Sequence, residues 1–349
     1  MDTEKTKSKD SKPKWITGWL PTLAGVFPVI STRLTTGDIV GGWRVRWGIR
    51  RMGYRVNPGL YAVGKPDTSS PVLVTANYKL TFDSLRKHLN NISAWILVLD
   101  TKGVNVWCAA GKGTFGTEEL IRRIKSINLS SLMKNRTLIL PQLGAPGVAA
   151  HIVTAQTGFK IIYGPIRAAD LPKFLANGLK TDPAMRNVTF TLKERFAVIP
   201  VELVQSWKMA FAALVYFIIL RLISGNLLSW STVGGFLPYL AAIVMGCAVV
   251  PALLPFVPGK SFALKGWLAG VFGTFVCAWF SGHGAIDTIA YLLIMPAISA
   301  YLALNFTGCS TYTSLSGVKK ELRIALPLLI FSAISGIALQ MHNVWRTTQ

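Results

Sequence analysis

The sequence predicts an open α/β domain followed by an all-α membrane domain of five transmembrane helices. Two observations carry this prediction. Short β-rich runs alternate with helical patterns between about residues 70 and 200, which is typical of an α/β sheet. Beyond about residue 208 charges become scarce and long apolar runs begin, as in a chain that enters a membrane. We therefore expect a tail at residues 1–14, an α/β domain at 15–200 and a transmembrane domain at 201–349.

The N-terminal segments precede the alternating pattern. Residues 1–14 are polar and lysine-rich without an apolar run, so we expect a disordered tail and no signal peptide. Residues 15–30 are more apolar, but Pro21 and Pro28 interrupt them and they are too short to span a membrane. We expect this segment to lie on the domain or at the membrane surface.

Within the α/β domain, strands are expected at residues 72–75, 94–99, 138–140 and 160–163, with a further short β run at 104–107. Helices are expected at residues 81–89 and 148–157, from about Ala169, and from Thr117, a good N-cap residue followed by two acids. Ligands of such sheets bind at the carboxyl ends of the strands. Four Gly- or amide-rich loops follow these strands, at residues 75–77, 105–113, 142–147 and 164–165. They predict a large, flat ligand with a polar edge.

The C-terminal half contains five apolar segments, each near the roughly 20 residues that cross a hydrocarbon core. They lie at about residues 209–223, 233–256, 262–280, 285–304 and 322–339. Basic residues gather on one side of these spans: Lys193, Arg195, Lys208, Lys260, Lys265, Lys319, Lys320 and Arg323. The other side receives Arg221 and Arg346. Because basic loops stay in the cytoplasm, we expect the chain to cross the cytoplasmic (inner) membrane with its N-terminus on the cytoplasmic side and its C-terminus on the other side.

The net charge of +22 permits several partners. Six arginines, at positions 33, 44, 46, 50, 51 and 55, stand among Trp43, Trp47 and Tyr54. This pattern suits single-stranded nucleic acid, and it suits anionic lipid headgroups equally well in a membrane-tethered domain. We favour a solvated basic face, membrane lipid or a phosphate of an anionic cofactor, and expect no nucleic-acid partner.

Cys108 is the only cysteine in the first two hundred residues; Cys247, Cys277 and Cys309 all lie in the apolar part. A lone thiol in a Gly-rich turn cannot complete a disulfide or a structural zinc site there. Three alternatives remain: a reactive nucleophile, a single axial ligand to a cofactor metal, and an ordinary buried thiol. From spacing alone the buried thiol is as well supported as the other two together.

Other motifs are excluded or weak. A phosphate-binding P-loop would need glycine where Val106 stands and Ser or Thr where Gly113 stands, and no dinucleotide fingerprint occurs. A Cys–His hydrolase has only His88 and His151 available in this half, and neither lies in a motif. A polar stretch at residues 305–321 is either a solvated loop or a segment that faces the α/β domain.

Residues 105–112, Asn-Val-Trp-Cys-Ala-Ala-Gly-Lys, ahead of five spans resemble the corrinoid proteins of microbial mercury methylation (the HgcA family). The likeness extends to residues 74–81 and 307–321 and covers most of residues 55–345. The α/β domain is similar to the corrinoid-binding domain of corrinoid iron–sulfur proteins. The resemblance implies a Rossmann-like corrinoid-binding domain.

The resemblance also implies a site. The cysteine motif would form a cap helix, with Cys108 as catalytic residue and lower axial ligand to cobalt, Asn105 holding that helix and Trp107 packing beneath the ring. No Asp-x-His-x-x-Gly motif is present to supply a histidine instead. The remaining implied corrinoid contacts are Thr75, Asn77, Thr81, Val106, Ala109, Ala110, Gly111, Lys112, Gly113, Gln142 and Gly164.

The implied activity is a corrinoid-dependent methyltransferase of anaerobic metabolism that passes a methyl group from cobalt to Hg(II). A soft thiolate ligand favours this transfer by pushing electron density onto the metal. The methyl donor would be of the methyltetrahydrofolate type, and the electron donor a ferredoxin-like partner (HgcB) with two 4Fe–4S clusters. Because Cys108 is already assigned, we expect partner cysteines to deliver Hg(II), with Cys309 as a relay. The alternatives are a membrane-anchored corrinoid methyl carrier with another acceptor and a transporter; the scarcity of intramembrane charge argues against the transporter.

Overall fold

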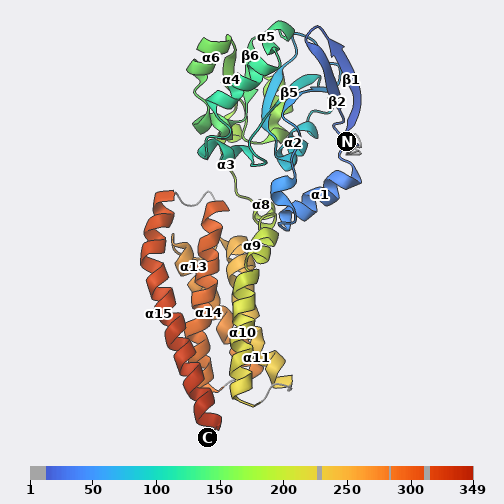
Figure 1. The fold of residues 1–349 in the computed structure, drawn as a ribbon. Helices are drawn as coiled ribbons and strands as arrows, with labels where there is room; N and C mark the ends of the chain where they lie inside the picture. The colour runs from blue at the N-terminus through green and yellow to red at the C-terminus, as the bar shows by residue number, and fades with distance from the viewer. Residues whose placement is uncertain (1–12, 226–229, 283, 310–314, 349) are drawn as a thin grey trace, which may run out of the picture. The chain divides into compact units, whose positions relative to one another are not determined.

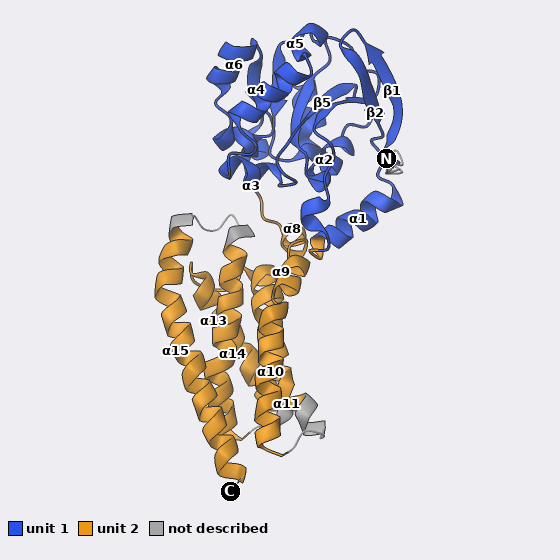
Figure 2. Cartoon of the chain, viewed as in Figure 1, with its two compact units in different colours: residues 1–45, 49–188 blue, residues 46–48, 189–349 orange. Residues whose placement is uncertain are grey.

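The computed structural model describes residues 13–225, 230–282, 284–309 and 315–348. Most of the expected tail and residues 310–314 of the polar stretch lie outside this range. The chain divides into two compact units, residues 1–45 with 49–188 and residues 46–48 with 189–349 (Figure 2). The first unit ends at residue 188, earlier than the expected boundary at residue 200.

The α/β unit is built on one seven-stranded mixed sheet, in the order β1-β2-β3-β5-β4-β6-β7 (Figure 1). Its strands are β1 Ile16–Thr22, β2 Gly25–Ile30, β3 Gly59–Val63, β4 Val72–Ala76, β5 Ala94–Leu99, β6 Thr137–Leu140 and β7 Lys160–Tyr163. Strands β5, β4, β6 and β7 are mutually parallel, whereas β1 pairs with β2, and β3 with β5, in antiparallel fashion. The four strands expected from the β-rich runs are all present.

The central strands are buried on both faces, which explains their unbroken apolar sequences. Every residue of β4 and β5 is buried. Alternate side chains enter separate cores: Val72 and Val74 pack with Phe115 and the helices on one face, and Leu73 packs with Phe82 on the other. Because successive side chains of a strand point to opposite faces of the sheet, one apolar run packs against the helices on both faces.

Eleven helical segments are described in this unit. They are α1 Thr36–Arg46, η1 Arg51–Gly53, α2 Lys79–Arg86, α3 Val106–Gly111, α4 Thr117–Ser126, α5 Leu129–Leu132, η2 Gln142–Gly147, α6 Ala150–Thr157, η3 Ala168–Asp170, α7 Leu171–Ala176 and η4 Pro183–Arg186. Helix α4 begins where Thr117 predicted, but its N-cap is Gly116. The Thr117 hydroxyl instead accepts a hydrogen bond from the Ala149 backbone N–H, at 2.8 Å.

One expectation about local structure was wrong. The β run at residues 104–107 is not a strand, because the Asn105 side chain caps a helix that begins at Val106. Residues 15–30, expected on the domain or at the membrane surface, form the β1–β2 hairpin, which extends the sheet beside β3. Trp15 anchors the hairpin, with ring centroids 5.2 Å from Phe82 and 5.8 Å from Tyr61.

The second unit is helical. It contains α8 Leu192–Phe196, α9 Ile199–Gln205, α10 Trp207–Ile223, α11 Trp230–Val244, a π-helical turn η5 Met245–Val249, α12 Val250–Leu253, α13 Phe262–Ser281, α14 Ala285–Asn305, η6 Phe306–Cys309 and α15 Leu315–Thr348. Among the described residues, four segments are long and apolar enough to cross a membrane: Gly234–Leu253, Phe262–Phe280, Ala285–Asn305 and Gly317–Thr348. The first expected span corresponds to α10, which reaches the required length only together with α8 and α9, across a bend of 46°. The structure thus has four candidate spans, or five if this bent pair is one.

Glycines let the helices of this unit approach closely. A Cβ atom on Gly270 of α13 would lie 2.5 Å from the Cα atom of Pro296, and one on Gly266 would lie 2.6 Å from that of Ala300, both on α14. Small residues at helix crossings are typical of membrane proteins, where packing rather than the hydrophobic effect joins helices.

Candidate functional site

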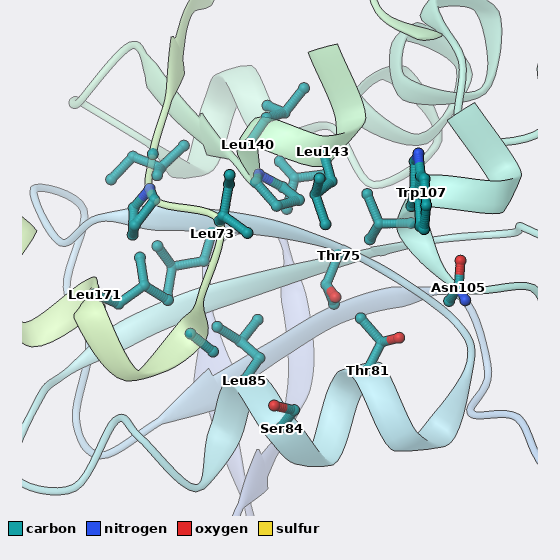
Figure 3. Close-up of a pocket in the computed structure, with 18 residues that line it drawn as sticks. Leu73, Thr75, Thr81, Ser84, Leu85, Asn105, Trp107, Leu140, Leu143 and Leu171 are labelled. Carbon is teal, nitrogen blue, oxygen red and sulfur yellow. The ribbon is translucent and has the colours of Figure 1, made fainter. Parts of the chain in front are cut away.

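A cavity of about 310 Å³ opens at the carboxyl ends of the parallel strands (Figure 3). The chain passes from β4 to β5 on one side and then returns to β6 on the other, so the strand order reverses at β4. Such a reversal point is where open α/β sheets bind their ligands. The lining residues are Leu73, Val74, Thr75, Thr81, Ser84, Leu85, Asn105, Val106, Trp107, Ile139, Leu140, Pro141, Leu143, Gly164, Pro165, Ile166, Ala168 and Leu171.

The cavity is neutral and mostly apolar. No charged side chain is among its lining residues, and its polar side chains are Thr75, Thr81, Ser84 and Asn105. Figure 3 shows Trp107 and Asn105 at one end and Leu171 toward the other, with Thr75 and Thr81 between them. A cavity of this character suits a ligand with a large apolar body and a few hydrogen-bonding groups.

Helix α3 presents two functional candidates outward. The Asn105 Oδ1 atom accepts a hydrogen bond from the Cys108 backbone N–H, at 2.8 Å, and so fixes the first turn. Ala109 and Ala110 pack into the core, whereas Trp107 is 43% exposed and Cys108 is exposed. The alternative that Cys108 is an ordinary buried thiol is therefore wrong.

Asn77 holds the loop that leads into α3. Its side chain is 1% exposed. The Oδ1 atom accepts hydrogen bonds from the Thr101 backbone N–H (3.1 Å), the Thr101 hydroxyl (2.9 Å) and the Gly103 N–H (2.9 Å), and Nδ2 donates to Asp100 (3.1 Å). The amide is thus occupied by residues 100–103, and it acts on the site by positioning the loop.

The loop after β6, which contains η2, packs tightly against the end of α3. A Cβ atom on Gly144 would lie 2.5 Å from the Phe115 ring, and one on Gly147 would overlap the Phe115 carbonyl oxygen and lie 3.0 Å from the Ala110 Cα atom. These glycines therefore join two loops of the site. Beside them, the Oε1 atom of Gln142 is buried without a hydrogen-bond partner, and a buried acceptor of this kind calls for a donor.

An ion network supports helix α2, which carries Thr81 and Ser84. Lys79 Nζ lies 2.7 Å from Asp38 Oδ1 and 2.6 Å from Asp83, while Arg86 donates to Asp38 Oδ2 and Asp83 Oδ1, both at 2.7 Å. Arg86 is fully buried. Burial alone would raise the pKa of Asp38, but hydrogen bonds from Lys79 and Thr35 hold that pKa well below its usual range. Burial and the nearby charges of Asp83 and Asp38 raise the pKa of Tyr54 to about 12.

The expected site residues fall into four groups. Thr75, Thr81, Asn105, Val106, Trp107 and Gly164 line the cavity. Cys108, Asn77 and Gln142 stand beside or near lining residues in the sequence but do not line the cavity, and Ala109 and Ala110 belong to the core. Gly111, the last residue of α3, and Lys112 and Gly113 after it are exposed.

Sequence reasoning missed most of the aliphatic lining. Leu85 and Leu171 were not among the expected contacts, because an apolar pocket wall and a core have the same composition, whereas Leu143 lies in a loop that was expected at the site. Ser84 carried a usable signal, since it stands one helical turn after Thr81. Within the described ranges, no group of three or more His, Cys, Asp or Glu side chains is arranged to hold a metal ion.

Comparison with known proteins gives a match over the α/β unit. Residues 50–175, which include the whole cavity lining, match the family described as CO dehydrogenase/acetyl-CoA synthase delta subunit. The acetyl-CoA decarbonylase/synthase complex subunit gamma of Methanopyrus kandleri is 34% identical over 122 residues, which cover 34% of this chain and 26% of that protein.

Two further relatives match comparably. The subunit gamma of Methanocaldococcus jannaschii is 32% identical over 124 residues, covering 35% of this chain and 25% of that protein. The corrinoid/iron-sulfur protein large subunit of Moorella thermoacetica is 31% identical over 122 residues, covering 34% and 27%. The chain thus spans about a quarter of the length of the relatives it matches.

Proposed function

We propose that the α/β unit binds a corrinoid in the cavity at the end of β4 and that the chain carries a methyl group for transfer to Hg(II), forming methylmercury. The observation that carries this proposal is α3, whose capped first turn presents Cys108 and Trp107 beside a neutral cavity. The segment matches a corrinoid/iron-sulfur protein, and residues 105–112 resemble the mercury-methylating family.

The residues present fit a corrinoid. An uncharged cavity wall suits the apolar faces of a macrocycle. Gln142 does not line the cavity, but it stands between the lining residues Pro141 and Leu143, and its buried Oε1 atom has no hydrogen-bond partner among the described residues. Thr75, Thr81 and Ser84 add hydroxyl groups on one side of the cavity. When bound, a corrinoid supplies a cobalt centre that accepts and donates methyl groups.

Cys108 is the residue that we assign as lower axial ligand to the metal. Its thiol is exposed on α3, and Asn105 fixes its backbone. A soft thiolate donor raises electron density at the metal and suits methyl delivery to Hg(II), a soft acceptor.

The remaining components of the reaction are part of the proposal. The methyl donor is of the methyltetrahydrofolate type, and the reductant is a ferredoxin-like partner with two 4Fe–4S clusters (HgcB), whose cysteines deliver Hg(II). The apolar helices anchor the chain in the cytoplasmic (inner) membrane with the α/β unit in the cytoplasm. Cys309 is the proposed relay for Hg(II), and unchanged mercury methylation by a Cys309→Ala variant would remove it from the route.

Electron paramagnetic resonance tests the assigned ligand. The full chain is reconstituted with Co(II) cobalamin, and the spectrum is compared with those of Cys108→Ala and of Cys277→Ala, a control for loss of a buried thiol. We expect a spectrum without nitrogen splitting that changes only in Cys108→Ala, because the common sulfur isotope has no nuclear spin. Nitrogen splitting in the unaltered chain, or no cobalamin binding, would contradict the proposal.

A second assay separates the acceptors. The names of the relatives favour one alternative, a membrane-anchored corrinoid methyl carrier with a different physiological acceptor. Methyl-loaded chain is mixed with Hg(II) and the reduced partner, and methylmercury is measured. Formation of methylmercury that requires Cys108 supports mercury as the acceptor, whereas a bound corrinoid that gives none supports the alternative.

A further inference from the structure

Helix α1 exposes one apolar face and buries a mixed face that contains Asp38. Ile39, Val40 and Trp43, which fall on one side of the helix, are all exposed, Trp43 to 65%. The opposite side, with Asp38, Gly42 and Val45, is buried. A surface helix normally turns its large apolar side chains to the core, whereas α1 turns three of them outward.

The helix cannot rotate to hide that face. Asp38 is held by Lys79 and Arg86 through the ion network, and the Tyr54 hydroxyl donates to the Asp38 carbonyl oxygen at 3.3 Å. A Cβ atom on Gly41 would lie 2.5 Å from the Tyr54 hydroxyl oxygen, so the helix backbone rests directly on that ring. The apolar face is therefore fixed outward by contacts within the α/β unit.

The surroundings of this face are basic. Arg33, Arg44, Arg50 and Arg55 are exposed, and Ile49 and Met52 extend the exposed apolar surface. The only acid between residues 33 and 55 is Asp38, which is buried against two cations. We call these residues, from the two sides of the turn after α1, the α1 surface: Ile39, Val40, Trp43, Ile49, Met52, Arg33, Arg44, Arg50 and Arg55.

We propose that the α1 surface lies in the interfacial layer of an anionic lipid bilayer. Tryptophan and aliphatic side chains beside arginines are the composition of helices that lie in the plane of a membrane interface. The arginines would contact headgroup phosphates through charge-assisted hydrogen bonds. Nucleic acid would leave Ile39, Val40 and Met52 without a suitable contact, and the apolar helices of the same chain make a bilayer the nearest partner.

The test uses the full chain in nanodiscs and does not depend on activity. In a Cys108→Ala, Cys309→Ala background, a fluorophore is attached to Trp43→Cys or, as a control, to Ile152→Cys on α6, which is 39% exposed. Figure 1 shows α6 and α1 at opposite ends of the α/β unit. With phosphatidylglycerol present, we expect the label at residue 43 to shift its emission to the blue, to be quenched by nitroxide lipids and to resist iodide. The label at residue 152 should respond to iodide alone.

Two further samples separate the lipid from other occupants. In phosphatidylcholine discs, or with the added substitutions Arg44→Glu and Arg50→Glu, we expect the label at residue 43 to lose its blue shift and its quenching by nitroxide lipids and to respond to iodide. A label at residue 43 that matches the one at residue 152 in every disc would overturn the proposal. Protection from iodide without quenching by nitroxide lipids would overturn it as well, because it would show that protein covers the surface.

Discussion

In the α/β unit a buried cluster joins opposite charges, whereas in the helical unit the close approach of α13 to α14 joins backbones. Lys79, Arg86, Asp38 and Asp83 lie within 2.7 Å of their partners in a buried cluster. Across the α13–α14 contact, Gly270 leaves no room for a single Cβ atom. The difference teaches that the two units fix their structures in different ways. In the α/β unit apolar burial already drives folding, and fully paired buried charges position the elements. In the helical unit lipid would provide no such driving force between helices, so close steric fit positions them.

The largest expected effect comes from breaking the charge cluster. Arg86→Met leaves Asp38 and Asp83 short of a buried cation, and removal of one buried partner costs about 3–5 kcal/mol. We expect hydrogen exchange of the α2 and β4 peptides to rise steeply while exchange in α13 and α14 is unchanged. Lys173→Met, which breaks an exposed pair with Asp182, should have a much smaller effect, because exposed ion pairs contribute little to stability. Equal effects of the two variants would refute a special role for the cluster.

The Asn77 amide gives the next largest effect. Asn77→Ala deprives the Thr101 and Gly103 backbone N–H groups of their acceptor, at about 1–3 kcal/mol for each buried donor left unpaired. We expect faster exchange in residues 100–108 and weaker cobalamin binding, measured by titration in the same full-length chain. Asn135→Ala, on a half-buried turn, is the matched control. Retained affinity would show that the loop keeps its position without this amide.

In the helical unit the matching test is steric. Gly270→Ala places a methyl group against Pro296, and overpacking of this kind typically costs about 1–3 kcal/mol, against which alanine returns up to about 1 kcal/mol of helix propensity. We expect a lower midpoint of unfolding in mixed detergent micelles. Gly234→Ala, whose Cβ meets nothing within 4 Å, should be neutral or stabilising. A neutral Gly270→Ala would remove the close α13–α14 approach as a source of stability.

The last expected effect concerns the stability of the α/β unit in acid and is absent at neutral pH. Its source is Asp38, whose pKa is lowered in the folded state. The carboxylate therefore contributes its full stability above the unfolded-state pKa of about 3.9 and loses it as the pH falls through the lowered folded value. Acid should destabilise β4 and α2, measured by amide exchange between pH 5 and 3, and this loss should be smaller in Asp38→Asn. An equal pH response of the two proteins would exclude Asp38 as the source.

Much of the fold could be predicted because the buried parallel strands are recognisable in the sequence as unbroken apolar runs. Strands β5 and β7 have the expected bounds. Strand β3 escaped prediction because its pairing partners lie far along the chain. The β1–β2 hairpin pairs locally, but Pro21 and Pro28 made its sequence look interrupted. The prediction for residues 104–107 was wrong because Val104, Val106 and Trp107 favour strands. A helix forms instead, and its first turn is fixed by one hydrogen bond that the Asn105 side chain accepts from the Cys108 backbone N–H.

The site was less predictable than the fold. Asn77 is polar and stands at a strand end, as a ligand contact would, yet its amide is used within the protein. Gly144 and Gly147 are close-approach glycines, but the surface they approach is Phe115 rather than a ligand. Residue type alone identified these positions as important, but their contacts in the structure show what each residue does.

The cavity also has a consequence for the order of events during synthesis. Its walls run from Leu73 to Leu171, and β4 must pair with β6 across that stretch before the reversal point exists. The N-terminus of the chain leaves the ribosome first, and domains generally fold as they emerge. All four candidate spans begin after residue 230. The pocket can therefore close while the membrane helices are still unmade, so cofactor loading need not wait for insertion of the chain.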